Sequence, residues 1–206
     1  MKKLVIIGSG GLGREVAQYV QDMKAYELMG FIDDDKTKQG TIYNTIEVLG
    51  NMDHLAKLSK TQEIYAFCAI AKPIIKQKIQ KELAAIGCQT INIIHPTAYL
   101  SPHITLGTNV LIAPMCVVTI NITIGDFVHI NPQCGIGHDT VIEDYTTLYW
   151  NVNLGGFVHI AQSVELGSQT FVKQELTIGA SSITGAGAVV LKDVPPNVTV
   201  KGVPAV

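Results

Sequence analysis

A histidine is followed directly by an aspartate in the stretch NPQCGIGHDTVIED, residues 131–144. Most of the surrounding sequence places Gly, Ser, Ala or Asn where the chain must turn, so a titratable pair at a turn suggests chemistry. A histidine titrates near neutral pH and can take the proton of an attacking amine or hydroxyl. A carboxylate on the other ring nitrogen fixes the imidazole tautomer. His138 and Asp139 are therefore candidates for a general base and its partner, and a solvated corner histidine is the alternative.

A glycine-rich segment near the start is the second candidate site. Gly8 to Gly13 (GSGGLG) fits GxGxxG, and Asp33 follows twenty residues after Gly13. This pattern is the fingerprint of a dinucleotide site, with the phosphates at a helix N-terminus. A complete dinucleotide fold has two such halves, and only about 90 residues are available here. The segment therefore predicts a site for one diphosphate and argues against a nicotinamide dehydrogenase.

The first half of the chain alternates strand-like and helix-like stretches that would hold this segment. Residues 3–8, 27–33 and 63–71 are apolar enough for buried strands, and residues 12–23, 52–59 and 73–87 have helical spacing. The last of these helices begins with a proline and ends at a glycine. Such alternation predicts a parallel sheet covered by helices.

The second half has a period of six residues. Seventeen hexads run from 94 to 195 without an insertion, and the first position is Ile, Leu or Val in sixteen of them, with Thr184 the exception. Hexapeptide periodicity is typical of a parallel β-helix, in which three hexads close one turn and residues 18 apart stack. Positions one and five are expected to point inward. Cys116 and Cys134, both at position five, are then stacked core thiols rather than a disulfide.

Composition excludes several classes of function. The formal net charge is −2, which gives no electrostatic basis for nucleic-acid binding. No apolar run approaches the roughly 18 residues of a membrane span, so no membrane insertion is expected. The four cysteines show no metal-binding spacing, which indicates reduced thiols in a cytoplasmic protein.

Two stretches carry a family resemblance: VIIGSGGLGREVAQYV with GFIDDD near the start, and the hexads with ITGAGAVVLKDVPPNVTVKGVPA at the end. Together they resemble the NeuD/PglD family of hexapeptide sugar acetyltransferases over essentially the whole chain. The resemblance implies an α/β Rossmann-like domain that binds a nucleotide sugar (1–92), followed by a left-handed parallel β-helix acyltransferase domain (93–206). It also implies a homotrimer, acetyl-CoA as donor and active sites between subunits. The left-handed sense comes from the family alone.

The resemblance also implies roles for individual residues. His138 becomes the catalytic base, with Asp139 orienting it where the family often has Glu, and Asn131 near the reacting groups. The residues expected to bind the acceptor are Ser9, Gly10, Gly11, Leu12, Asp33, Asp34, Ala71 and Lys72. Those expected to bind acetyl-CoA are Thr147, Gly156, Ser168, Ala186, Lys192 and Lys201, with the two lysines near its phosphates. The segment AIAKP (69–73) departs from the AIGD or AIGN of many relatives, which leaves the nucleotide open.

The expected function is acetyl transfer from acetyl-CoA to an amino group of a nucleotide-linked deoxy sugar. Direct transfer is favoured because no GxSxG motif or activated cysteine suggests an acyl-enzyme. O-acetylation of a sialic-acid-like sugar is the alternative, and a non-enzymatic nucleotide-binding trimeric scaffold is a remote one. The other five histidines have no acidic residue directly after them. A trimer interface along the coil is expected from outward aromatic residues, namely Phe127, Tyr145, Tyr149, Trp150 and Phe157.

Overall fold

The computed structural model describes all 206 residues, which form two compact units, Met1–Ile93 and Ile94–Val206. The first unit holds a six-stranded sheet in the order β3-β4-β2-β1-β5-β6. Its strands are β1 (Lys2–Ile7), β2 (Tyr26–Ile32), β3 (Ile42–Tyr43), β4 (Ile46–Gly50), β5 (Tyr65–Cys68) and β6 (Gln89–Thr90). Its helices are α1 (Gly11–Met23), α2 (Met52–Thr61) and α3 (Pro73–Ile86). None of the three has the length and apolar character needed to cross a membrane.

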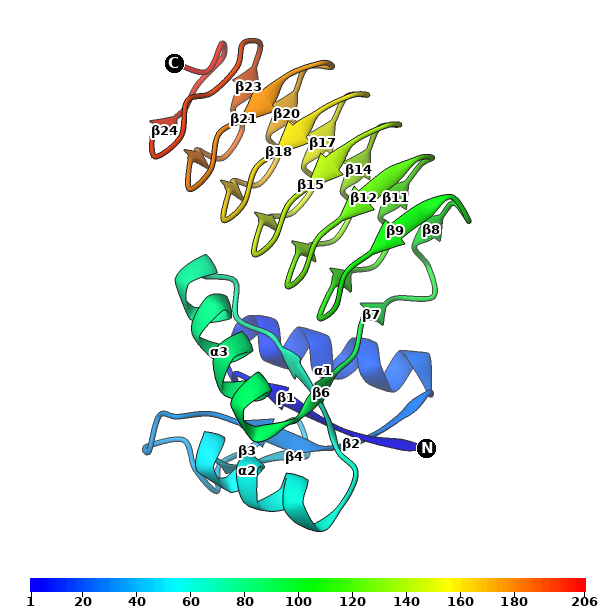
Figure 1. Ribbon diagram of the computed structural model, residues 1–206, viewed down its shortest axis with the longest axis vertical. Coiled ribbons are helices and arrows are strands. Elements are labelled where there is room, and N and C mark those ends of the chain that lie inside the picture. Colours follow the sequence, from blue (N-terminus) through cyan, green and yellow to red (C-terminus); the bar gives the residue numbers. More distant parts are fainter. The chain divides into compact units, whose positions relative to one another are not determined.

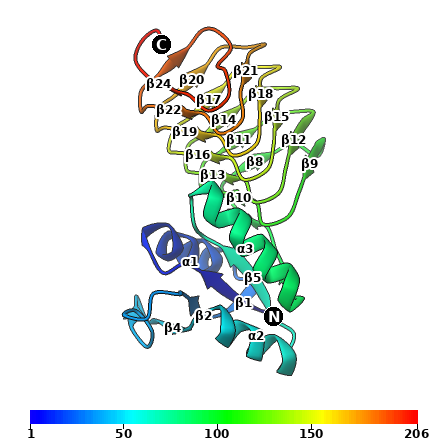
Figure 2. The same cartoon turned by 60° about the vertical axis from the view of Figure 1, so that its left-hand side comes forward.

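The strands and helices of this unit follow the expected alternation. β1 pairs in parallel with β2 and β5, and its central residues are fully buried. Figure 2 shows α1 on one side of the sheet and α2 and α3 on the other. α3 begins at Pro73 and stops at Gly87, which adopts a left-handed φ of 69°. The short hairpin β3–β4 was not predicted, because its turn residues Asn44 and Thr45 form no standard hairpin signal.

The second unit is a parallel β-helix with three faces, visible as ranks of short stacked strands in Figure 1. The seven-stranded face contains β7 (Ile93–Ile94), β10 (Leu111–Ile112), β13 (His129–Ile130), β16 (Thr147–Leu148), β19 (Glu165–Leu166), β22 (Ile183–Thr184) and β24 (Thr199–Val200). The six-stranded face contains β8 (Tyr99–Leu100), β11 (Val117–Val118), β14 (Gly135–Ile136), β17 (Asn153–Leu154), β20 (Phe171–Val172) and β23 (Val189–Val190). The five-stranded face contains β9 (Ile104–Leu106), β12 (Ile122–Ile124), β15 (Val141–Ile142), β18 (His159–Ile160) and β21 (Thr177–Ile178).

The register of the coil confirms the period read from the sequence. Val117 pairs with Gly135 and Gly135 with Asn153, so each turn takes 18 residues. From Ile112 onward every first-position residue is buried, including Thr184, the exception to the apolar pattern. Cys116 and Cys134 are both buried and both free, as predicted. The coil core is therefore a stack of first- and fifth-position side chains.

The fourth residue of each hexad forms the bend. From Asn109 to Ser181, every sixth residue has a left-handed φ between 55° and 65°. Only part of this series is small or polar in the way expected of a turn, because Met115, Phe127, Tyr145 and Phe157 also belong to it. A bulky side chain in this conformation costs free energy that a glycine or asparagine would avoid. The coil therefore imposes its corner geometry on residues that would not choose it locally.

Candidate functional site

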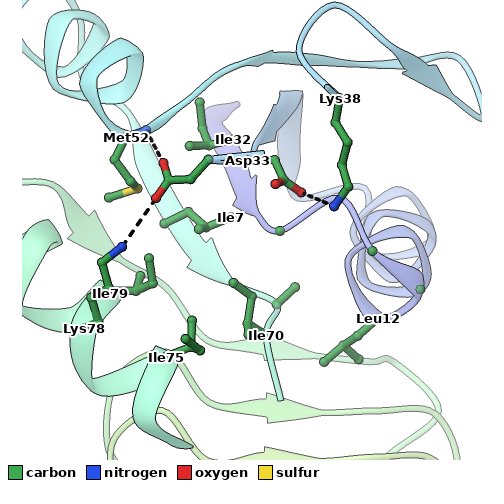
Figure 3. Close-up of a pocket in the computed structure, with 15 residues that line it drawn as sticks. Ile7, Leu12, Ile32, Asp33, Lys38, Met52, Ile70, Ile75, Lys78 and Ile79 are labelled. Carbon is green, nitrogen blue, oxygen red and sulfur yellow. Dashed lines mark hydrogen bonds and ion pairs between the residues drawn. The ribbon is translucent and has the colours of Figure 1, made fainter. Parts of the chain in front are cut away.

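A cavity of about 480 Å³ opens at the carboxyl ends of β1, β2 and β5 in the first unit (Figure 3). Its walls are largely aliphatic, with a few charged groups, which is the usual make-up of a small-molecule site. In open parallel sheets this edge is also where ligands bind. The residues that line it include Ile7, Gly8, Gly10, Gly11, Leu12, Ile32, Asp33, Asp34, Lys38, Met52, Ile70, Ile75, Lys78 and Ile79.

The glycine segment forms the floor of this cavity where α1 begins. Gly8 has a φ of 98°, and a side chain at Gly13 would overlap the Gly8 carbonyl oxygen, so both positions require glycine. Gly10 and Gly11 face open space, since a Cβ on either would meet no atom within 4 Å. No side chain caps α1 and its first turn carries no acidic residue. Its backbone N–H groups are thus available to an anion in the cavity.

Asp33 is tied to the glycine segment rather than left open. Its Oδ2 accepts hydrogen bonds from the Ser9 Oγ–H at 2.6 Å and the Ser9 backbone N–H at 2.9 Å, and Lys38 Nζ lies 3.2 Å from it. Burial alone would raise the pKa of Asp33, but the hydrogen bonds from Ser9, Asp35 and Lys38 lower it to about 2. Asp33 therefore stays ionised and holds the loop, and Ser9 is buried in that contact.

Asp34 has partners different from those of Asp33. Its Oδ1 accepts from the Met52 N–H at 3.2 Å, and its Oδ2 lies 3.6 Å from Lys78 Nζ. In Figure 3, Lys38 stands beside Asp33, while Met52 and Lys78 lie across the aliphatic residues from it. Lys38 and Lys78 were missed because neither belongs to a motif. Ala71 and Lys72, which the resemblance suggested, are not among the lining residues.

The second site is the His138 corner, defined as the turns that join the six-stranded to the five-stranded face. His138 Nδ1 lies 2.9 Å from Asp139 Oδ2, and the imidazole is more than half exposed. A carboxylate only accepts, so Nδ1 carries the hydrogen and Nε2 of the neutral ring offers a lone pair. The contact between adjacent residues is possible because Asp139 sits at the bend, with φ 57°. This geometry is that of a general base oriented by its neighbour.

Asp139 has a second partner that sequence reasoning missed. Asn121 Nδ2 donates to Asp139 Oδ1 at 3.1 Å from the preceding turn of the coil. Hydrogen bonds from His138 and then Asn121 lower the pKa of Asp139. The signal was available, because Asn121 is 18 residues before Asp139, one turn of the coil.

Gly156 and Phe157, one turn above the pair, shape the space around the imidazole. A Cβ on Gly156 would lie 2.5 Å from His138 Cε1 and 2.6 Å from Nε2, so the ring occupies room that only glycine leaves. The Phe157 ring meets the imidazole edge to face, with centroids 5.2 Å apart and planes at 88°. Gly156 was expected to bind the donor, and in the structure it leaves room for the His138 ring.

The other predicted residues of the coil fall on different parts of it. Asn131 lies at the turn between the seven- and six-stranded faces, here called the Asn131 corner, and its Nδ2 donates to the Leu148 carbonyl at 2.7 Å. A single chain therefore does not bring Asn131 to His138. Thr147 is buried on the seven-stranded face. Ser168, Ala186 and Lys201 follow the Asn131 corner upward, while Gly156 and Lys192 lie on the His138 corner, so these five residues border the six-stranded face.

A second histidine–carboxylate pair appears in space, although no sequence neighbour revealed it. His159 Nε2 lies 2.8 Å from Glu143 Oε1, and Glu143 Oε2 accepts from the Gln162 N–H at 3.0 Å. The two residues are 16 positions apart and meet across adjacent turns. Here Nε2 is the nitrogen held by the carboxylate, so the tip of the ring is not open to a reactant. His138 therefore remains the better candidate base.

The aromatic residues expected on the outside of the coil differ in how far they are exposed. Phe127 is only 1% exposed, so the prediction that it lies on the surface is wrong. Its ring packs near that of Tyr145, one turn later, with centroids 6.2 Å apart. Tyr149 is half-buried and its hydroxyl donates to Glu165 Oε2 at 2.9 Å. Trp150 and Phe157 are exposed, as expected.

Known proteins resemble both units of the chain. The PglD N-terminal domain family matches residues 3–83. A mutant of perosamine N-acetyltransferase from Caulobacter crescentus, solved with CoA and GDP-perosamine, is 28% identical, with TM-score 0.93 over 100% of this chain and 96% of that one. The acetyltransferase domain of PglB from Neisseria gonorrhoeae, solved with acetyl coenzyme A, is 29% identical, with TM-score 0.92 over 100% and 98%. A search of curated protein sequences gives no significant match.

The likeness extends over complete chains. WeeI from Acinetobacter baumannii is 30% identical, with TM-score 0.91, and the match covers 100% of this chain and 99% of that one. The expected fold class is confirmed, an α/β unit followed by a left-handed parallel β-helix. The family suggested by the glycine segment and the hexads is confirmed as well. This chain belongs to the NeuD/PglD-type family of sugar acetyltransferases.

Proposed function

We propose that the protein transfers the acetyl group of acetyl-CoA to an amino group of a nucleotide-linked sugar, with His138 as general base. The observation that carries this proposal is the His138 corner, where Asp139 holds Nδ1 and Nε2 projects over Gly156. Two similar enzymes support the choice of substrates, since one was solved with CoA and GDP-perosamine and another with acetyl coenzyme A. A hydroxyl acceptor would use the same base and is the second candidate.

The reaction needs no covalent enzyme intermediate. As the sugar nitrogen attacks the thioester carbonyl, a C–N bond forms and the N–H proton passes to His138 Nε2. The C–S bond then breaks, and the proton passes from the imidazolium to the departing thiolate of CoA. Asp139, already bonded to Nδ1, stabilises the imidazolium between these steps. Cys68 and Cys88 are unsuited to nucleophilic attack, because burial raises the pKa of Cys68 to about 11 and also raises that of Cys88. Cys116 and Cys134 are buried in the core of the coil, where no substrate reaches them.

The cavity of the first unit is proposed to hold the nucleotide of the acceptor. The diphosphate would lie against the N–H groups at the start of α1, with Lys38 nearby, and the nucleoside would extend along the aliphatic wall toward Asp34 and Lys78. Binding a remote handle is an effective way to orient a small reacting group. Ser9 and Asp33 contribute indirectly, by fixing the glycine segment.

A nucleoside diphosphate alone is therefore expected to raise the melting temperature, since a ligand that binds only the native state stabilises it. NAD serves as the control ligand and is expected to give no shift. Gly10→Leu should abolish the shift, because its side chain would project into the cavity while its backbone, at φ −71°, suits any residue. A shift with NAD but not with a nucleoside diphosphate would contradict the proposal that this cavity binds the nucleotide. An undiminished shift in the Gly10→Leu variant would contradict it as well. Thermal denaturation with GDP, UDP and dTDP would also compare the bases.

The protein is proposed to act as a homotrimer that packs along the six-stranded face. Tyr99, Val117 and Phe171 stand in one column on this face and are all exposed. Its two borders add Met115 and Trp150 at the Asn131 corner, and Ile120 and Phe157 at the His138 corner. An exposed apolar surface of this extent marks an interaction site. A neighbouring subunit on this face would cover the proposed donor residues and bring further groups toward His138.

Light scattering at micromolar concentration should give three times the 22.2 kDa mass of the chain. Replacing Val117 and Phe171 with aspartate should shift the mass toward that of one chain, since each would bury an unpaired charge in the interface. The same double replacement at the exposed residues Thr123 and Thr177 of the five-stranded face is the matched control. A monomeric parent protein would exclude an active site shared between subunits. We expect the enzyme to work in the cytoplasm, where its four free cysteines remain reduced.

A further inference from the structure

Three residues on two successive turns of the His138 corner form one hydrogen-bonded array. Asn121 Nδ2–H donates to Asp139 Oδ1 at 3.1 Å, and His138 Nδ1–H donates to Asp139 Oδ2 at 2.9 Å. The two bonds occupy different oxygens of one carboxylate. A rotation of that carboxylate that improved one bond would disturb the other. The position of the imidazole is thus coupled to the amide of Asn121.

The side chain of Asn121 is not needed to build the corner. Its backbone N–H already donates to the His103 carbonyl at 2.9 Å, as the backbone N–H of Asp139 does to that of Ile120 at 3.0 Å. The φ of 57° at Asn121 suits Asn, Asp or Gly equally well. Asn121 is also exposed, so its side chain contributes little packing. What remains for the amide is its bond to Asp139.

We infer that Asn121 is a positioning residue for the general base, acting through Asp139. This inference rests on the proposed function, in which His138 accepts the proton of the acceptor. The Asp139 carboxylate is partly exposed and could turn into water, where it would leave Nδ1 without a partner. The amide donor of Asn121 favours the ionised, inward orientation of Asp139, and the carboxylate in turn keeps the hydrogen on Nδ1. Nε2, the nitrogen that faces the reactants, is then held as an acceptor.

Two substitutions separate a donor role from a merely structural one. Asn121→Gly removes the donor at no backbone cost and should lower kcat about 3- to 10-fold, the usual net effect of losing one hydrogen bond. Asn121→Asp keeps the shape but sets a carboxylate against Asp139, so it should lower kcat further than Gly does. The KM for acetyl-CoA should not change in either variant. Ser181→Gly is the matched control and should keep the kcat of the parent, because Ser181 is exposed with a φ of 58° at a turn between the five- and seven-stranded faces, away from both borders of the six-stranded face.

A double substitution tests whether Asn121 acts through Asp139. In an Asp139→Asn background, Asn121→Gly should change kcat by less than about 2-fold, since the partner that it orients no longer carries charge. Full additivity of the two losses would overturn the inference. So would an Asn121→Asp enzyme with the activity of the parent, because shape rather than the donor would then be what matters.

An activity-independent readout distinguishes failure of this inference from failure of the proposed function. In protein labelled with ¹⁵N-histidine, His138 should be the Nδ1–H tautomer, and Asn121→Asp should give a mixture of both tautomers. If no sugar is acetylated but this change is seen, the array stands and the proposed function falls. If acetylation occurs but the tautomer and kcat are the same in the parent, the Asn121→Gly protein and the Asn121→Asp protein, the proposed function stands and Asn121 has no positioning role.

Discussion

Replacing His138 with alanine is expected to lower kcat about 10²- to 10⁴-fold, the usual contribution of a general base. The imidazole is the one group at its corner with a carboxylate on one nitrogen and an open second nitrogen. The melting temperature should hardly change, because the side chain is more than half exposed and its loss leaves no cavity. Steady-state kinetics and thermal denaturation of the same preparation measure both effects.

His159→Ala is the control for this experiment. His159 also pairs with a carboxylate, but through Nε2 and on the outer side of the five-stranded face. Its removal should leave kcat within about 3-fold of the parent, because surface substitutions away from a site have small effects. The reverse outcome, with full activity in His138→Ala and loss of activity in His159→Ala, would show that the base is His159 and not His138.

Gly156→Ala is expected to lower kcat by about 10²-fold, the effect of a misplacement of about 1 Å in a reacting group. The new methyl group would lie 2.5 Å from Cε1 and 2.6 Å from Nε2 of His138, so the ring must swing away. The imidazole is exposed and can move without disturbing the core, so stability should be kept. The loss should appear as a lower kcat for acetyl transfer to the sugar. Thermal denaturation should show that the variant is still folded.

Gln174→Ala is the matched substitution, since Gln174 is exposed and occupies the same hexad position one turn above Gly156. Its activity should remain close to that of the parent. A Gly156→Ala enzyme with unchanged kcat would show that the seating of the ring seen here is not the reactive one.

The repeat could be predicted almost completely from sequence, because each hexad fixes its own inward positions and the 18-residue turn follows from the period. The same arithmetic places Asn121 beneath Asp139 and Gly156 above His138. It does not predict the contact between His159 and Glu143. These residues are 16 positions apart, and their contact depends on how two long side chains reach across a turn. It also does not give the burial of Phe127, whose ring packs near that of Tyr145 one turn later.

In the first unit, the glycine segment could be predicted because its backbone needs glycine at Gly8 and Gly13. Asp33 was found by its spacing, but its role as the acceptor of the Ser9 hydrogen bonds required the fold. Lys38 and Lys78 reach the cavity from a loop and from α3. Lys38 is five residues from its partner Asp33, and Lys78 pairs with Asp34 from a different element, but neither lysine belongs to a motif that would mark it.

The most direct test of the account is acetyl transfer itself. The protein is mixed with acetyl-CoA and a panel of nucleotide-linked sugars, some with an amino group and some with hydroxyl groups only, and free thiol is followed over time. We expect rapid thiol release with at least one amino sugar, none with hydroxyl-only sugars, and loss of the signal in the His138→Ala protein. Release with hydroxyl-only sugars would make the enzyme an O-acetyltransferase. No release with any sugar, together with a thermal shift from NAD, would contradict the transferase assignment.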